Sequence, residues 1–590
     1  MKENKLFPRF IRLLFILLGS LFLTLLSFLA TDENISKTLF LGYFSQVQVF
    51  FINYLLILTL VLIFSFLTKR IDLGFLISFV LIFALGLANV TKLTYRSQML
   101  RLSDLLLVGE ADQMTDAGYK LVFFRFFWLA LGSGLILAIL FFLSSYKKAS
   151  SRKVLGIFAI TALALSIFFI RSSTFDNYFN QEFNPWVQVE KEKAFGLVHN
   201  FTRTYRELIV PKPNGYDKYF AGESFEAYPD QVMDEDEKIN MVFLMLESYN
   251  DFDSLGVDFE IDPYDDMEYL RNNSISGRLF VPVFGGGTVQ SERSFITSSH
   301  AQPYNFRKRN SLAHFLNDQG YTTVAMHPNT WKFYDRLNFN KNLGFQYFYA
   351  DENLFESLRK PGTYMEDKDL LPLVYKDFKE KSKAGPYFNF TVTIQNHGPY
   401  PTGEVGVDYV KYDGTYDRED YNSINQYFHG IKATSQELTK FLKDFENDEP
   451  TLFIIFGDHN PSLGKNNSGF AYLGLDIESD SLEAYTNKYT TPYYIHANQS
   501  LKDLWGKDFV GKGPNLSTEF LISYAFDYLG LGGSSMVRVQ NKVFPGLEAY
   551  NDSIIQVNEN LSFTGSYKDQ DFLNRYRFIE YFYNTHYFYD

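Results

Sequence analysis

Hydrophobic residues are concentrated in five long stretches in the first third of the chain. They cover about residues 11–30, 47–67, 73–88, 121–143 and 154–170. Each stretch is close to the roughly 20 residues that an α-helix needs to cross a bilayer. The basic flank of the first stretch would also suit a signal peptide, but long apolar stretches follow and no small-residue cleavage site stands out. The pattern predicts a helical membrane domain of five spans over residues 1–171.

The charges of the short loops predict how these spans are oriented. Lys69 and Arg70 lie between the second and third stretches, and Lys147, Lys148 and Arg152 lie near the gap between the fourth and fifth. Basic loops stay on the cytoplasmic side of a membrane. We therefore expect a multi-pass protein of the cell membrane, with the N-terminus inside and everything after residue 171 outside.

Two segments near the membrane have a less definite pattern. Residues 97–108 carry apolar side chains at helical spacing, which predicts either an interfacial helix on the outer leaflet or a packed loop helix that touches no lipid. Residues 172–235 are polar, aromatic and irregular. We interpret them as a connector that leaves the membrane and wraps the following domain.

From residue 236 to the C-terminus, short apolar runs alternate with helical patterns. Strands are expected at 239–246, 322–326, 387–394, 451–456 and 493–496, with helices at 311–319 and 427–445 between them. Such alternation is typical of an α/β sheet with helices on both faces. The aromatic-rich tail after residue 500 is expected to cover an edge of this sheet.

Ionisable side chains follow four of the predicted strands. They are Glu247, His327, His397 and the adjacent pair Asp458 and His459. In open α/β sheets, ligands bind beyond the carboxyl ends of the strands, so these groups can meet at one site. Carboxylates and imidazoles together are a ligand set for a divalent cation such as Mn²⁺ or Zn²⁺.

A candidate nucleophile follows a glycine-rich turn. Gly285, Gly286 and Gly287 precede Thr288, which opens a predicted helix reaching Ile296. A hydroxyl at a helix N-terminus lies beside free backbone N–H groups that suit a phosphate. A threonine hydroxyl needs activation to attack, and a bound cation provides it. Alternatively, Thr288 is only the residue that starts the helix after a tight turn.

Composition narrows the functional classes. The formal net charge of -13 argues against nucleic acid as a partner, because such proteins usually present a basic face. The chain has no cysteine, which excludes disulfides, thiolate ligands and a cysteine nucleophile. Complete absence of cysteine from a large exported domain fits a Gram-positive surface protein.

Five motifs occur in order along the predicted α/β domain. They are LESYNDF from Leu246, GGGTVQSE from Gly285, HPNTWKFYDR from His327, NHGPYP from Asn396 and GDHNPSLG from Gly457. With this combination the chain resembles the lipoteichoic acid synthase family, which are phosphoglycerol transferases of the alkaline phosphatase and sulfatase superfamily. The resemblance covers most of residues 238–498 and the five-span anchor. It implies an extracellular catalytic domain with a mixed sheet and helices on both faces.

The resemblance assigns roles to individual residues. Glu247, Thr288, Asp458 and His459 match the metal-ligand positions of the family, and Thr288 also matches its nucleophile. One divalent metal ion is implied, with Mn²⁺ preferred and Mg²⁺ or Zn²⁺ as alternatives.

Further residues match positions that line the substrate. Arg336 and His397 match residues that hold phosphate or glycerol phosphate, and His327 matches another site-lining position. Tyr334 stands where the polymerases of the family usually carry Trp, and Asn329 stands where they tend to carry Asp.

The implied reaction uses phosphatidylglycerol as the donor. Its glycerol phosphate passes to Thr288 with release of diacylglycerol, and then to a lipoteichoic acid chain, a glycolipid primer or a wall polysaccharide. Met245 stands where the polymerases tend to carry His, and GDHNPSLG is closer to relatives that decorate surface polysaccharides. These departures weigh against polymerisation more than against phosphotransfer.

Three other functions compete with this interpretation. Phosphoethanolamine transfer uses a similar site, but its better-known enzymes are rich in disulfides. Sulfatase activity requires a Cys-x-Pro-x-Arg motif, which the chain lacks. A surface scaffold that kept the fold without catalysis is a third alternative, although all four expected metal ligands are present.

Overall fold

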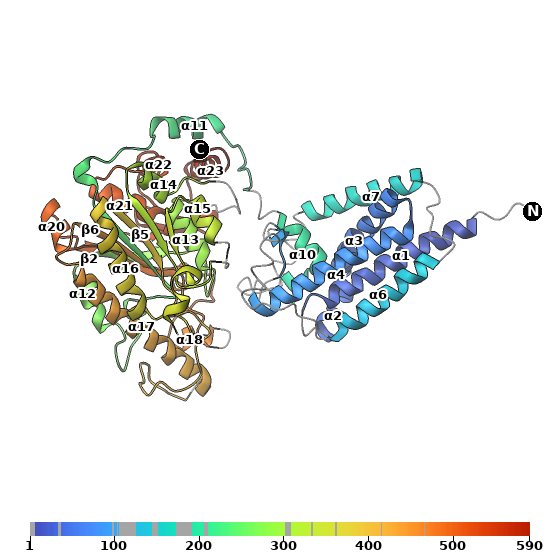
Figure 1. Cartoon of the computed structure of the whole chain (residues 1–590), viewed down its shortest axis with the longest axis horizontal. Coiled ribbons are helices and arrows are strands. Elements are labelled where there is room, and N and C mark those ends of the chain that lie inside the picture. Colours follow the sequence, from blue (N-terminus) through green and yellow to red (C-terminus); the bar gives the residue numbers. More distant parts are fainter. Residues whose placement is uncertain are drawn as a thin grey trace, which may run out of the picture. The chain divides into compact units, whose positions relative to one another are not determined.

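The computed structural model describes residues 6–32, 37–96, 99–102, 104–105, 125–143, 152–172, 192–205, 210–300, 308–331, 334, 336–359, 363–414, 416–464 and 467–589. The chain divides into two compact units, Met1–Ile209 and Val210–Asp590 (Figure 1). Unit 2 therefore begins within the segment that we expected to be a connector.

Unit 1 is a bundle of apolar helices. Its helices are α1 (Leu6–Leu29), α2 (Lys37–Ser45), α3 (Val47–Thr68), α4 (Ile71–Arg96), α6 (Arg125–Leu143), α7 (Arg152–Arg171) and α10 (Leu197–Arg203). Among the described residues, four segments are long and apolar enough to cross a membrane: Ile11–Leu29, Val47–Thr68, Ile71–Leu93 and Arg152–Arg171. The predicted span at 121–143 corresponds to α6, whose apolar part is Leu131–Leu140; residues 121–124 lie outside the described residues. Unit 1 thus has four to five apolar helices.

Polar side chains join the helices of unit 1. The hydroxyls of Thr59 and Ser166 lie 3.0 Å apart between α3 and α7. The Asn53 side chain donates to the carbonyl of Phe195 and accepts from the backbone N–H of His199, which ties the start of α10 to α3. Residues 195–199 therefore pack on α3 within unit 1.

The predicted helix at 97–108 lies partly outside the described residues. Within the described part, Met99 and Leu100 are buried, and the backbone N–H of Leu100 donates to the Asn89 side chain at 2.7 Å. Residues 99–100 therefore form a packed loop against α4, while Leu105 is exposed.

Unit 2 is built on a nine-stranded mixed sheet with the order β4-β3-β5-β1-β6-β7-β2-β8, and β9 also pairs with β2. Neighbours from β4 to β6 are parallel, whereas β7 is antiparallel to β6 and to β2. The strands are β1 (Asn240–Leu246), β2 (Ser274–Phe280), β3 (Thr322–Met326), β4 (Tyr347–Tyr349), β5 (Tyr387–Val392), β6 (Thr451–Gly457), β7 (Thr490–Ala497), β8 (Gly511–Lys512) and β9 (Leu516–Ser517). A separate antiparallel sheet contains β10 (Leu547–Tyr550), β11 (Ile554–Val557) and β12 (Asn560–Phe563).

Helices cover both faces of the large sheet, as predicted (Figure 1). One face packs against α11 (Lys218–Ala227), α13 (Thr288–Thr297), α14 (Leu312–Asp318), α20 (Gln499–Trp505), α21 (Leu521–Leu529), α22 (Ser535–Val543) and α23 (Gln570–Thr585). The other face packs against α12 (Glu268–Asn272), α16 (Asp367–Lys381), α17 (Arg418–Asp444) and α18 (Ser468–Tyr472). Two further helices are α15 (Arg336–Asn342) and α19 (Leu482–Tyr489).

The central strand β1 shows why the sequence gives two cores. Its residues are all buried, and they alternate between the faces. Met241, Phe243 and Met245 point into one core, whereas Val242, Leu244 and Leu246 point into the other. A strand covered on both faces is apolar throughout, in contrast to the alternating pattern of a half-exposed strand. The tail after residue 500 was expected to cover a sheet edge, and its strands β8 and β9 do pair with β2 at one end of the large sheet. Its last helix, α23, instead packs within the first core through Tyr576 and Ile579.

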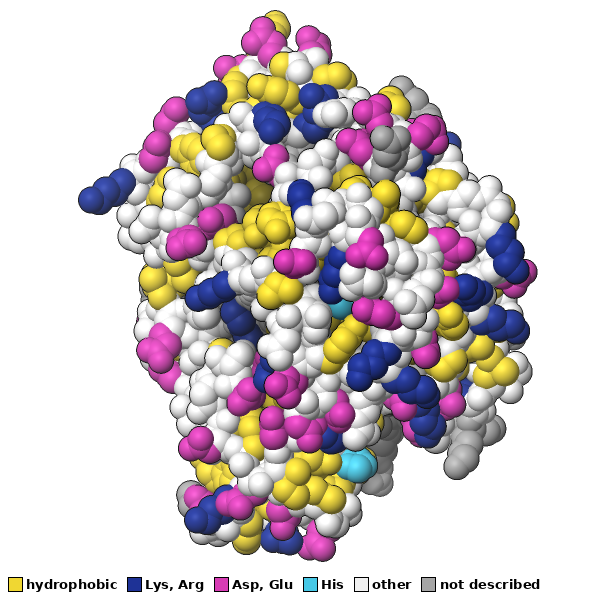
Figure 2. Space-filling model, turned by 90° about the vertical axis from the view of Figure 1, so that its left-hand side faces the viewer, with side chains coloured by type: hydrophobic (Ala, Val, Ile, Leu, Met, Phe, Trp, Pro, Cys, Tyr) yellow, Lys and Arg dark blue, Asp and Glu magenta, His cyan; other side chains and the backbone are white. Residues whose placement is uncertain are grey.

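The surface of the face shown in Figure 2 is mixed. Acidic and basic side chains are interspersed over it, and hydrophobic side chains occur in small groups between them. Such a surface is typical of a domain in contact with water.

Candidate metal centre and nucleophile

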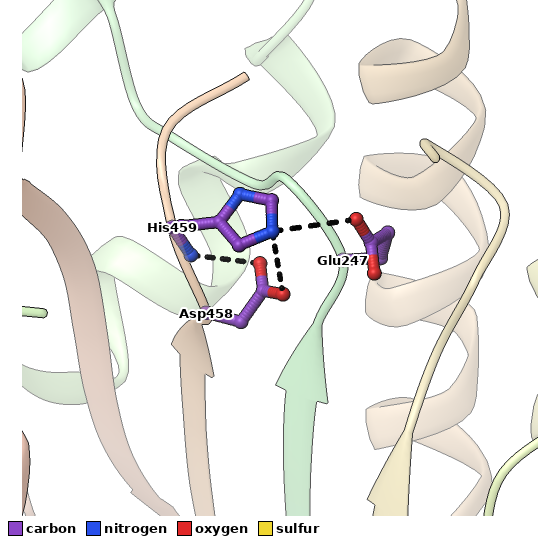
Figure 3. A group of neighbouring side chains, drawn as sticks. All are labelled: Glu247, Asp458 and His459. Carbon is purple, nitrogen blue, oxygen red and sulfur yellow. Dashed lines mark hydrogen bonds and ion pairs between the residues drawn. The ribbon is translucent and has the colours of Figure 1, made fainter. Parts of the chain in front are cut away.

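Glu247, Asp458 and His459 meet at one edge of the large sheet (Figure 3). Strands β1 and β6 are adjacent and parallel, with Leu246 beside Gly457 in the register. The residue after β1 is Glu247 and the residues after β6 are Asp458 and His459, so they leave the sheet side by side. The carboxyl ends of parallel strands meet at the same edge, which is the basis on which the sequence predicted this grouping.

The three side chains are buried and close together. His459 Nε2 lies 3.2 Å from Asp458 Oδ2 and 3.7 Å from Glu247 Oε1. One ligand atom from each residue lies within 4.8 Å of the others. Three buried groups of this kind, at this spacing, are close enough to share one cation.

Thr288 completes the group as the first residue of α13. Its Oγ1 lies 3.3 Å from Glu247 Oε2 and 3.4 Å from His459 Nε2. Gly287 precedes it with a φ of 95°, in the left-handed region that glycine adopts without steric cost. The backbone N–H of Gly285 donates to the carbonyl of Asn460 at 3.0 Å, which ties the glycine turn to the residue after His459.

The bonding of the cluster fits a divalent cation. Asp458 Oδ1 accepts from the backbone N–H groups of Ser248 and His459, both at 2.7 Å. Asp458 Oδ2 is buried and, apart from its 3.2 Å approach to His459 Nε2, has no hydrogen-bond partner among the described residues. His459 Nδ1 lies 2.9 Å from the Asn460 carbonyl, which places a proton on Nδ1 and leaves Nε2 as a ligand atom. A buried carboxylate oxygen without a donor is costly unless a cation or proton compensates it.

The electrostatics of the cluster lead to the same conclusion. Burial and the neighbouring Glu247 raise the pKa of Asp458 to about 7. Burial would lower the pKa of His459, but the charges of Asp458 and Glu247 outweigh it and raise that pKa. Burial is the first cause of the raised pKa of Asp458, and the concentration of negative charge in the cluster contributes to the raised pKa of both groups. A divalent cation would supply the compensating positive charge.

Arg336 and His327 lie together beside α13. Arg336 is buried and donates to Glu292 Oε2 from Nε at 3.1 Å and from Nη2 at 2.8 Å. His327 follows β3, and its Nδ1 lies 3.1 Å from the Val392 carbonyl. Burial, Arg336 and His397 lower the pKa of His327 well below its ordinary value.

Of the remaining predicted residues, His397 and Asn329 lie in loops and Tyr334 lies in a 3₁₀-helical turn. His397 is exposed, with its Nδ1 at 2.6 Å from the Gly398 carbonyl and 3.2 Å from the Tyr364 hydroxyl. Tyr334 has a φ of 60°, and its ring lies 5.7 Å from the Arg336 guanidinium. Asn329 accepts through Oδ1 from the backbone N–H of Thr330 at 2.8 Å, a local turn contact rather than a contact with the cluster.

Comparison with known proteins places this arrangement in a family. Residues 239–520 match the family model described as Sulfatase. The chain carries a sulfatase domain. The matched segment begins just before β1 and includes every residue of the cluster, from Glu247 to His459.

The chain has relatives that are named for different functions. It is 31% identical over 281 residues to a putative cyclic beta-1,2-glucan modification protein of Rhizobium meliloti, covering 45% of this chain and 42% of the relative. It is 23% identical over 283 residues to lipoteichoic acid synthase 2 of Bacillus subtilis, covering 44% and 41%. The aligned region thus spans about two fifths of these relatives.

Among solved structures, one similar chain is the phosphoglycerol transferase GacH of Streptococcus pyogenes in complex with sn-glycerol-1-phosphate. It matches with a TM-score of 0.49 and 19% identity, covering 63% of this chain and 94% of that chain.

Sequence reasoning assigned no role to several residues that contact the predicted ones, and Glu292 and Ser248 are two examples. Glu292 is buried and lies four residues after Thr288, so it falls on the same side of α13 and receives Arg336 there. The signal available in the sequence for this contact was an acidic residue one helical turn after the candidate nucleophile. Ser248 contacts both Glu247 and Asp458. The only signal in the sequence for these contacts was that Ser248 directly follows Glu247.

Proposed function

We propose that this protein is a metal-dependent phosphotransferase that moves glycerol phosphate from phosphatidylglycerol to a cell-surface acceptor. The observation that carries the proposal is the position of the Thr288 hydroxyl. It lies within 3.4 Å of both Glu247 Oε2 and His459 Nε2, at the N-terminus of α13. This position therefore brings together a nucleophile, a helix N-terminus that can bind an anion, and a set of cation ligands.

The metal ligands that we propose are Glu247, Thr288, Asp458 and His459. A nitrogen ligand beside carboxylates suits Mn²⁺ or Zn²⁺ well and admits Mg²⁺, and we favour Mn²⁺. When bound, such a cation favours the alkoxide form of a hydroxyl ligand and offsets the negative charge of a phosphate.

The reaction would proceed in two displacements at phosphorus. In the first, Thr288 Oγ1 bonds to the headgroup phosphorus while the bond from phosphorus to the diacylglycerol oxygen breaks. The proton lost by Thr288 ends on the released diacylglycerol. In the second, an acceptor hydroxyl bonds to phosphorus, the Thr288 oxygen leaves, and the acceptor proton returns to it. Dividing one difficult transfer into two steps is the purpose of a covalent intermediate.

Residues around the cluster would bind the donor. The Arg336 guanidinium, held in place by Glu292, would offset charge on the phosphate oxygens. We propose that His397, with His327, Tyr334 and Asn329, lines the space for the glycerol part of the headgroup. The exposure of His397 supports a place at the mouth of the site.

Two sources support the choice of acceptor and compartment. The relatives named for cyclic glucan modification and for lipoteichoic acid synthesis favour a saccharide or polyglycerol phosphate acceptor. The basic loops of unit 1 favour a multi-pass protein with unit 2 outside the cell, where the headgroups of the outer leaflet are accessible.

The proposal is tested with the full-length protein in liposomes that contain labelled phosphatidylglycerol. Diacylglycerol release should require a divalent cation and fall by at least roughly 10³-fold in Thr288→Ala. Thr297→Ala, at the other end of α13, should leave the rate unchanged. Release by Thr288→Ala at the wild-type rate would contradict the proposal, and release only from phosphatidylethanolamine would redirect it to phosphoethanolamine transfer.

A further inference from the structure

Ser248 contacts both carboxylates of the candidate metal centre at once. Its backbone N–H donates to Asp458 Oδ1 at 2.7 Å, and its hydroxyl donates to Glu247 Oε1 at 2.9 Å. Its carbonyl accepts from the Tyr427 hydroxyl at 3.0 Å. All three polar groups of this buried residue are therefore engaged, and two of them act on the predicted metal ligands.

These contacts distinguish the two oxygens of each carboxylate. Ser248 donates hydrogen bonds to Oδ1 of Asp458 and to Oε1 of Glu247. The other oxygens contact further members of the cluster: Asp458 Oδ2 lies 3.2 Å from His459 Nε2, and Glu247 Oε2 lies 3.3 Å from Thr288 Oγ1. Glu247 Oε1, which Ser248 holds, also lies 3.7 Å from His459 Nε2. Fixing one oxygen of a carboxylate orients the other toward a cation.

The backbone of Ser248 adopts a conformation that serine rarely takes. Its φ is 51°, in the left-handed region where residues other than glycine are strained. The turn that follows is packed tightly, because a Cβ on Gly457 would lie 1.9 Å from the Tyr249 carbonyl oxygen. The surroundings thus hold Ser248 in a strained conformation that brings its N–H and hydroxyl to the two carboxylates.

We propose that Ser248 is a positioning residue that orients Glu247 and Asp458 for the cation, and that the strain at Ser248 is the cost of this function. The inference rests on the proposed function. Residues that hydrogen-bond to metal ligands typically change metal affinity by roughly 10–100-fold when they are removed. The hydroxyl, and not only the backbone turn, is what a serine supplies here.

Substitution of Ser248 by glycine separates the contribution of the hydroxyl from that of the backbone turn. Ser248→Gly removes the hydroxyl but relieves the left-handed strain, so a purely structural role predicts a metal-free protein that is as stable as wild type, with unchanged cation binding. Our proposal predicts that stability is kept or raised while cation binding weakens. Ser248→Ala removes the hydroxyl and keeps the strain, so it should weaken cation binding to a similar extent.

A matched control exists on α13. Ser298 is also buried and also has a φ of 51°, but it follows the C-terminal end of the helix, opposite to Thr288. Ser298→Gly should relieve comparable strain without a change in cation binding.

The experiment measures Mn²⁺ binding to the full-length protein in detergent by titration calorimetry, together with the thermal midpoint with and without Mn²⁺. The expected result is a Kd for Mn²⁺ that is roughly 10–100-fold higher in Ser248→Gly and Ser248→Ala than in wild type and Ser298→Gly. The midpoint of metal-free Ser248→Gly should be no lower than that of wild type. Wild-type Kd values in both Ser248 variants would overturn the inference, while leaving the proposed function intact.

Failure of the proposed function has a different signature. If the wild-type protein binds none of Mn²⁺, Zn²⁺ and Mg²⁺, or if Glu247→Gln binds as well as wild type, then the metal centre itself is wrong, and the inference about Ser248 falls with it.

Discussion

Buried carboxylates in unit 2 differ in how their charge is compensated. Glu292 pairs with Arg336. Asp458 and Glu519 each lie near a second carboxylate instead. Burial and Glu247 raise the pKa of Asp458 to about 7, and burial and Glu580 raise the pKa of Glu519 to about 8. At Asp458 a cation can supply the missing positive charge, whereas Glu519 Oε1 is buried and has no hydrogen-bond partner in the part of the chain that the structure describes.

Glu519 should therefore make the stability of the protein depend on pH. Its pKa in the folded protein, about 8, is above the ordinary value of 4.5, so the folded state holds a proton that the unfolded state releases. This contribution is fully present below about pH 4.5 and is lost as pH rises toward 8. A glutamine at this position cannot titrate. The thermal midpoint of Glu519→Gln minus that of wild type should therefore increase as pH rises from 5 to 8.

The control for this prediction is Glu223→Gln on the exposed side of α11. Its midpoint should follow that of wild type at every pH. A constant difference between Glu519→Gln and wild type across the same range would show that Glu519 does not titrate there.

Strands that are buried on both faces were predicted well from the sequence. The strand predicted at 322–326 is β3, and those at 239–246 and 451–456 differ from β1 and β6 by one residue at one end. Fully buried strands give continuous apolar runs that are easy to recognise. Because Glu247, Asp458 and His459 follow these runs directly, the sequence also predicted that these three meet at the sheet edge, whereas His327 and His397, predicted for the same site, are not part of that close group.

Other strands could not be found in this way. β2 has the sequence SISGRLF, in which polar residues and a glycine interrupt the apolar pattern, and β8 and β9 have two residues each. Their pairing depends on neighbours that are distant in the sequence.

The contacts of Ser248 in the site could not be predicted for the same reason. They depend on a backbone turn packed against Gly457, which no local sequence pattern reveals.

Gly457 should be essential to the junction of β1 and β6. An added Cβ would lie 1.9 Å from the Tyr249 carbonyl oxygen, which is part of the backbone and cannot move aside alone. We expect Gly457→Ala to lower the free energy of unfolding by about 3 kcal/mol, the upper range for overpacking, and to weaken Mn²⁺ binding. Denaturant titration and calorimetry measure the two effects.

Gly403→Ala is a suitable control, because an added Cβ there meets nothing within 4 Å. Its unfolding free energy should stay within about 0.5 kcal/mol of wild type. A similarly mild effect of Gly457→Ala would mean that the β1 turn does not lie against β6 as described.

At the scale of the whole molecule, an apolar helical unit is joined to a sulfatase domain in one chain. Exposed apolar side chains such as Ile157, Ile160 and Phe168 on α7 suit contact with lipid. The sequence predicted the long apolar helices of unit 1, because such segments are continuous and easy to recognise. It did not predict that residues 192–205 pack on unit 1, because that contact depends on a few polar groups such as Asn53.

The absence of cysteine allows a direct test of orientation. A single cysteine at Glu223, exposed on unit 2, should react in intact cells with a maleimide that cannot cross membranes. A single cysteine at Lys69, between α3 and α4, should react only after the cells are opened. Labelling of the Lys69 position, but not of the Glu223 position, in intact cells would reverse the predicted topology.

The proposed mechanism depends most on a covalent bond between Thr288 and the transferred group. The direct measurement is mass spectrometry of the full-length protein after brief incubation with phosphatidylglycerol and Mn²⁺, acid quenching and digestion. We predict that the peptide containing Thr288 carries glycerol phosphate on that residue, and that the modification disappears in Asp458→Asn. An unmodified Thr288 in protein that is actively releasing diacylglycerol, or the modification on another residue, would contradict the account.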